Sequence, residues 1–71
     1  MTGNELLRRL RKLGRERGVA VRFAEERGKG SHGTLCFGDR ATVLKDRRAE
    51  IGRGLLHATL RQLGLTERDL R

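Results

Sequence analysis

The sequence contains no proline, tryptophan or tyrosine, and its 71 residues include a single cysteine. Cys36 cannot form a disulfide within the chain, and the Cys and His residues lack the spacing of a zinc site. Because Phe23 and Phe37 are the only aromatic residues, RNA-binding surfaces that stack bases on exposed rings are disfavoured. No apolar run approaches the roughly 20 residues of a membrane-spanning helix, and no signal-peptide core is present. These absences predict a protein of the reducing cytoplasm without a membrane span.

Positive charge is what the sequence has in excess. Lys and Arg number 17 against 9 Asp and Glu, which gives a net charge of +8. Arginine supplies 14 of these 17 residues, and its guanidinium group forms paired hydrogen bonds with phosphate. The excess predicts a polyanionic partner: nucleic acid, an acidic protein or, least favoured, an anionic lipid surface.

The length allows one small domain, residues 1–71, with a thin hydrophobic core. Thr2 and Glu5 have the spacing of a capping box, and leucines then recur at helical spacing up to Gly14. Alternating apolar residues follow in two segments, and a short Gly38-Asp39 connection leads to a third. The predicted elements are a helix over 3–13, strands over about 18–25, 31–37 and 41–44, and a helix over 55–63 with leucines at 55, 56, 60 and 63.

This order predicts an α+β fold, a two-layer α-β-β-β-α domain. Both helices pack on one face of a three-stranded antiparallel sheet, because the strands are short and each carries one apolar face. The Gly14 to Gly18 segment is expected to be a basic connection, and Thr66 and Asp69 are expected to cap a final helical turn.

His32 is the strongest candidate for chemistry. Strand alternation puts it on the face opposite Leu35 and Phe37, and it follows Gly28-Lys29-Gly30-Ser31 directly. An imidazole can remove or donate a proton near neutral pH, and a glycine-rich turn with a lysine can hold a phosphate beside it. These groups suffice for RNA cleavage by attack of the 2′-hydroxyl on the adjacent phosphate. The alternative is an ordinary surface histidine.

Other candidate positions are weaker. Arg8, Arg11 and Lys12 lie on the polar side of the first predicted helix, where they can add affinity for phosphate or simply face solvent. His57 falls away from the leucine stripe of the second helix, so we interpret it as a surface residue. Cys36 shares the face of His32, but about 13 Å of strand separates the two, too far for direct activation of the thiol.

The sequence resembles the HicA family, the toxins of bacterial HicA/HicB toxin–antitoxin pairs. The resemblance covers about residues 4–70 and rests on Gly30-Ser31-His32, on Thr42-Val43 and on the ending from Leu60 to Glu67. It departs from the family pattern at Cys36, where many members have an aromatic residue, and in the third strand, where a Val-Pro pair is common.

The resemblance implies a double-stranded-RNA-binding-like fold and a metal-independent endoribonuclease that needs no cofactor. It implies cleavage of mRNA with His32 as the essential residue, and a HicB-like antitoxin that covers this histidine. Two other functions stay open: a non-catalytic RNA-binding module of the same fold, and a domain that mainly binds an acidic protein.

Overall fold

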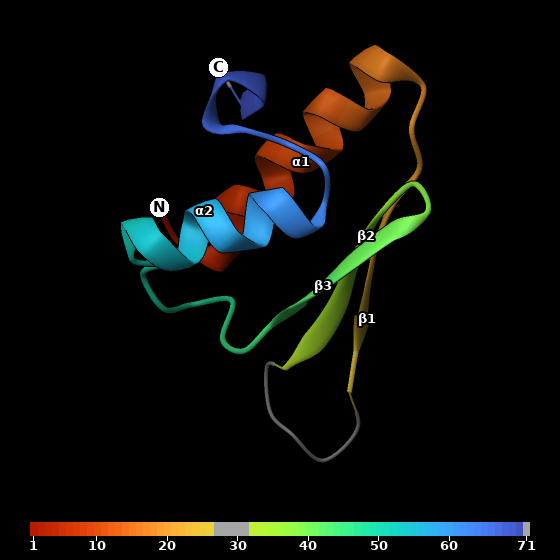
Figure 1. Ribbon diagram of the computed structural model, residues 1–71. Coiled ribbons are helices and arrows are strands. Elements are labelled where there is room, and N and C mark those ends of the chain that lie inside the picture. The colour runs from red at the N-terminus through yellow and green to blue at the C-terminus, as the bar shows by residue number, and fades with distance from the viewer. Residues whose placement is uncertain (27–31, 71) are drawn as a thin grey trace.

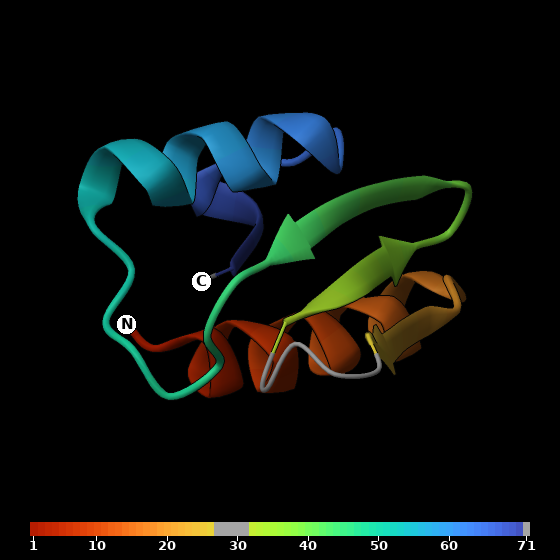
Figure 2. The same cartoon turned by 90° about the horizontal axis from the view of Figure 1, so that it is seen from below.

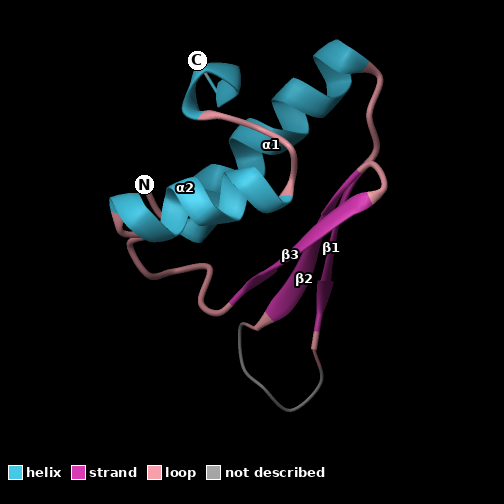
Figure 3. Ribbon diagram, in the orientation of Figure 1, coloured by secondary structure: helices cyan, strands magenta, loops and turns pink. Residues whose placement is uncertain are grey.

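The computed structural model describes residues 1–26 and 32–70, and it confirms the predicted α-β-β-β-α order (Figure 1). Two helices pack on one face of a three-stranded antiparallel sheet, and a short 3₁₀ helix follows (Figure 3). The elements are α1 (Gly3–Arg17), β1 (Val21–Glu25), β2 (Gly33–Phe37), β3 (Arg40–Leu44), α2 (Arg53–Gln62) and η1 (Glu67–Leu70).

Helix α1 begins as predicted but ends later. The Thr2 hydroxyl accepts a hydrogen bond from the Glu5 backbone N–H at 3.2 Å, which is the expected cap. The helix does not end at Gly14, however, because the left-handed residue that ends it is Gly18, with φ 68°. Gly14 stays helical, and a Cβ there would lie 2.5 Å from the carbonyl oxygen of Val19. Its missing side chain thus lets the chain fold back tightly.

The sheet has the order β1-β2-β3, so β1 and β3 are its two edges. The predicted hairpin between β2 and β3 is confirmed, with Gly38 and Asp39 as its turn. Strand β1 begins at Val21 and not near residue 18, because the Val19 N–H still bonds to Gly14 of the helix. Phe23 pairs with Leu35 and Glu25 pairs with Gly33, so these four residues share the face toward the helices.

The core lies between this face and the helices. α1 contacts β1 and β2, whereas α2 contacts β3 (Figure 2). Leu55 is 61% exposed, which corrects its predicted place in the α2 stripe. The apolar stripe of α2 starts at Leu56. Leu55 lies one residue earlier, about 100° away around the helix, and therefore faces outward. The buried apolar residues are Leu6, Leu7, Leu10, Leu13, Leu35, Phe37, Leu44, Leu60, Leu63 and Leu65.

The C-terminal η1 docks on α1. Arg17 at the end of α1 forms an ion pair with Asp69, and the same carboxylate accepts hydrogen bonds from the backbone N–H and hydroxyl of Thr66. The predicted Thr66 and Asp69 pairing is therefore confirmed. These bonds lower the pKa of Asp69 below its ordinary value, and the hydrogen bond from the Arg17 side chain is the largest cause.

Within the described ranges, neither α1 nor α2 has the length and apolar character of a membrane-spanning helix.

Candidate nucleic-acid interface

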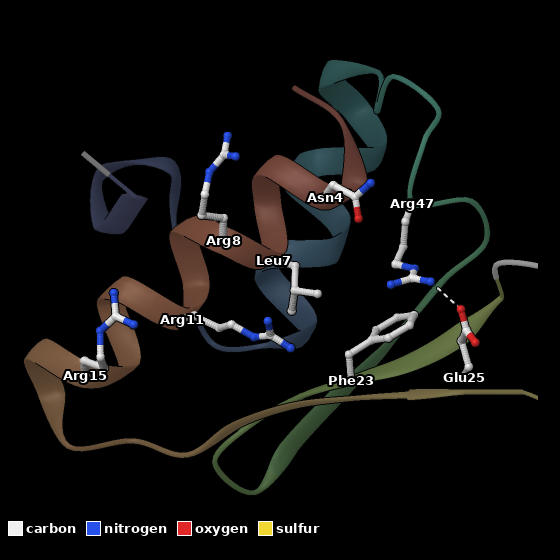
Figure 4. A pocket seen from close by; sticks show the side chains of 8 residues that line it. All are labelled: Asn4, Leu7, Arg8, Arg11, Arg15, Phe23, Glu25 and Arg47. Carbon is white, nitrogen blue, oxygen red and sulfur yellow. Dashed lines mark hydrogen bonds and ion pairs between the residues drawn. The ribbon is translucent and has the colours of Figure 1, made fainter.

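An open cleft lies beside α1, between this helix, the end of β1 and the loop that follows β3 (Figure 4). Its volume is about 580 Å³, and four of its lining residues are arginines. We call it the arginine cleft. It is lined by Asn4, Leu7, Arg8, Arg11, Arg15, Phe23, Glu25 and Arg47. One carboxylate among four guanidinium groups leaves the lining strongly positive.

Helical spacing explains three of these arginines. Arg8, Arg11 and Arg15 are separated by three and four residues, so they share one side of α1. All three are exposed. They form a row about 10 Å long, from the rise of about 1.5 Å per residue. In Figure 4 the Arg11 side chain extends from this row toward Phe23.

Arg47 reaches the cleft from the loop after β3, and three contacts hold it. Its backbone carbonyl accepts a hydrogen bond from the Asn4 N–H at 2.8 Å, which fastens the loop to the start of α1. Its guanidinium lies over the Phe23 ring, 4.8 Å from the centroid, a cation–π contact. The guanidinium also forms an ion pair with Glu25. Arg47 is therefore fixed in position before any ligand binds.

One polar atom of Arg47 is unsatisfied. Its Nε is buried and finds no hydrogen-bond partner within the described part of the chain. The side chain as a whole is 31% exposed, so the end of the guanidinium still faces the cleft. A guanidinium has five N–H donors, and Arg47 has donors left for an anion.

A second cavity, of about 450 Å³, adjoins the first. Arg11 and Arg15 line both, and the second continues past Gly14 to the start of β1. The two neighbouring cavities follow α1 from Asn4 to Gly18, about 20 Å of helix length, and we call them together the groove.

The predicted basic residues of α1 divide between two places. Arg8 and Arg11 lie in the arginine cleft. Lys12 lines a different cavity, where two basic side chains, Arg9 and Lys12, face two carboxylates, Glu16 and Asp69. The structure thus brings together two of the three predicted residues and separates the third from them.

His32 lies directly before β2 and is partly buried. Its carbonyl oxygen accepts a hydrogen bond from the Glu26 N–H at 2.9 Å, so the pairing of β1 with β2 continues to this point. Alternation along β2 then places the His32 side chain on the outer face of the sheet, with Thr34 and Cys36. The arginine cleft opens on the helix-facing side, so the two sites lie on opposite faces of the sheet, both near the end of β1.

The predicted phosphate-binding turn, Gly28, Lys29, Gly30 and Ser31, lies outside the described residues. It connects Glu26 to His32 in the sequence, and hence links β1 to β2.

His57 is exposed on α2, as predicted, and its Nε2 lies 2.9 Å from the Glu67 carboxylate of η1. No sequence pattern predicts this pair. Cys36 is partly buried on the outer face of the sheet, as expected for a small apolar residue. Within residues 1–26 and 32–70, no three His, Cys, Asp or Glu side chains gather as metal ligands would.

The sequence patterns predict two of the four arginines of the cleft and miss Arg15 and Arg47. Arg15 falls in the predicted connection because the leucine pattern ends at Gly14; in the longer helix, its spacing from Arg8 and Arg11 puts it on the same side. For Arg47 the sequence offers no comparable signal, because a loop residue has no periodicity and its contact with Phe23 depends on the tertiary fold.

No family model, curated protein or solved structure matches this chain.

Proposed function

We propose that this protein binds RNA through the arginine cleft and cleaves it with His32 as the acid–base group. The observation that carries the binding is the row of guanidinium groups on α1 that meets the fixed Arg47 in one open cleft. Arginine is the side chain best suited to phosphate, because its planar fork donates two parallel hydrogen bonds.

In the proposed reaction, His32 removes the proton from a ribose 2′-hydroxyl, and the oxygen attacks the adjacent phosphorus. A new bond joins the 2′-oxygen to phosphorus, the bond to the 5′-oxygen breaks, and that oxygen takes up a proton from water. The products are a 2′,3′-cyclic phosphate and a free 5′-hydroxyl. Positive groups near the phosphate stabilise the charge that develops on it in the transition state.

The resemblance to HicA supports a more specific role. We infer a cytoplasmic toxin that cleaves mRNA and thereby inhibits translation, paired with a HicB-like antitoxin. The net charge of +8 suits both an RNA substrate and an acidic protein partner.

The first experiment compares the native chain with His32→Ala, and uses His57→Ala as the matched histidine control. Expressed without a partner in a bacterium, the native chain and His57→Ala should arrest growth and degrade mRNA. His32→Ala should do neither, because loss of a general acid or base lowers the rate by about 10²- to 10⁴-fold. With purified protein, the cleaved RNA should carry 2′,3′-cyclic phosphate ends. Equal growth and intact mRNA in all three cultures would contradict the proposed nuclease.

A second candidate function is RNA binding without cleavage. The observation that favours it is the separation of His32 from the arginine cleft by the sheet. In that case His32→Ala leaves RNA binding and any growth effect unchanged, whereas Arg8→Gln or Arg11→Gln weakens binding and lowers its dependence on salt.

A further inference from the structure

We infer that the groove along α1 holds the phosphate backbone of a single RNA strand, and that Glu25 occupies the Arg47 end of this groove until a phosphate replaces it. This inference rests on the RNA binding proposed above. It specifies that the RNA is single-stranded and that its phosphate displaces Glu25 from Arg47. It gives Arg15 and Arg47 the role of phosphate contacts and Glu25 that of a competing anion, three roles that the sequence patterns do not predict.

The shape of the charge distribution favours one backbone. Arg8, Arg11 and Arg15 stand along one wall in a single row. The groove follows α1 for about 20 Å, and basic grooves of this kind track the backbone of single-stranded nucleic acids. A single strand needs one such row, whereas a duplex presents two backbones.

The groove offers phosphate contacts and not base contacts. Its one aromatic ring, Phe23, is covered by the Arg47 guanidinium, so this face of the ring is not free to stack on a base. Contacts to phosphate carry no sequence information by themselves. Binding in this groove should therefore depend little on base identity.

Glu25 competes with the incoming phosphate. Its carboxylate pairs with the same guanidinium that faces the cleft, and both groups are partly exposed, at 53% for Glu25 and 31% for Arg47. An exposed ion pair of this kind is weak and is exchanged easily. Phe23 and the Asn4 hydrogen bond keep Arg47 in place when Glu25 leaves, so little side-chain ordering is needed at the moment of binding.

The test measures binding of a fluorescent single-stranded RNA of mixed sequence to the full chain, as a function of salt. His32→Ala is the background for all variants, so that cleavage does not consume the probe. Arg15→Gln and Arg47→Gln should each weaken binding by about tenfold and reduce the salt slope by about 1. Arg15 is exposed, and no hydrogen bond or ion pair of its side chain is seen within the described residues, so Arg15→Gln tests the groove even if Arg47→Gln unfolds the protein.

Two further variants sharpen the result. Glu25→Gln should tighten binding by about two- to fivefold, because it removes the competing carboxylate. Arg61→Gln is the matched control, since it removes the same charge from an exposed position in the last turn of α2. It should change binding by less than about twofold.

Several outcomes would overturn the inference: equal losses for Arg15→Gln and Arg61→Gln, no gain for Glu25→Gln, or tighter binding of the matching RNA duplex or of polyglutamate. The failure of the nuclease is a separate result. If the chain with His32 intact leaves RNA uncut but the groove variants change binding as expected, the groove inference stands and the proposed cleavage fails.

Discussion

At the scale of single residues, Gly33 shows how the sheet and the arginine cleft depend on each other. A Cβ at this position would lie 2.4 Å from Cζ of Phe23 and 2.7 Å from the carbonyl oxygen of Ala24. The Phe23 ring therefore lies over the backbone of the neighbouring strand, in the space that a side chain would fill. This placement holds the ring under the Arg47 guanidinium.

We expect Gly33→Ala to lower the free energy of unfolding by about 1–3 kcal/mol, because the added methyl displaces Phe23 and presses on the backbone. Gly54→Ala is the control, since nothing lies within 4 Å of a Cβ there. It should raise the free energy of unfolding by up to about 1 kcal/mol, the helix preference of alanine over glycine. Urea denaturation of both variants measures these changes. An unchanged urea midpoint for Gly33→Ala would show that the ring has room to move.

At the scale of elements, much of the fold follows from local patterns. The capping residues Thr2 and Glu5, the leucine spacing and the Gly38-Asp39 hairpin each determine an element with its neighbours in the sequence. The predicted end of α1 is wrong because the sequence has two glycines, Gly14 and Gly18, that could each end the helix. Only the fold shows that Gly14 makes a close contact while Gly18 has the left-handed conformation.

The candidate site was less predictable than the fold. Arg8 and Arg11 were accessible to helical periodicity, but the position of Arg47 depends on the Asn4 hydrogen bond and the Phe23 ring, which join three separate segments. Even with the correct elements, the sequence does not place His32 and the arginines relative to each other. That relation follows from strand register.

The docking of η1 on α1 predicts a dependence of stability on pH. The pKa of Asp69 is lowered in the folded state, chiefly by its hydrogen bond from Arg17. The stabilisation is therefore complete above the unfolded pKa of about 3.9, and it is lost as the pH falls through the folded value. Asp69→Asn should unfold at lower urea than the native chain at neutral pH, and the difference should vanish in acid.

A matched variant tests whether Asp69 causes this pH dependence of stability. Asp39 lies in the exposed hairpin turn, so Asp39→Asn removes the same charge far from η1. We expect it to leave the pH dependence of the urea midpoint close to that of the native chain. A constant gap between native and Asp69→Asn at all pH values would attribute the effect to packing instead.

At the scale of the whole molecule, the net charge of +8 acts over a body of only 33 × 24 × 17 Å. The Debye length is about 30 Å at about 0.01 M salt and about 8 Å at about 0.15 M. At low salt, the positive charges therefore repel one another across nearly the full length of the protein. Self-repulsion of this kind destabilises the folded state.

We expect the thermal unfolding midpoint of the free chain to rise as sodium chloride increases from about 0.01 M to about 0.15 M. A variant with Gln at positions 8, 11 and 15 should begin with a higher midpoint at low salt and rise less, because three charges of the row are gone. Scanning calorimetry of both chains gives the comparison. A larger salt effect in the variant would show that local contacts of these arginines outweigh their repulsion.

The free edge of β1 separates the two faces that carry the arginine cleft and His32. One route for an RNA strand that occupied both crosses this edge, whereas the edge of β3 lies on the far side of the sheet. A strand from another molecule that extended the sheet at β1 would therefore stand in the path of the RNA. It would pair with the backbone of β1, Val21–Glu25, and block this route without taking the place of His32, whereas the same strand added at β3 would leave the route open.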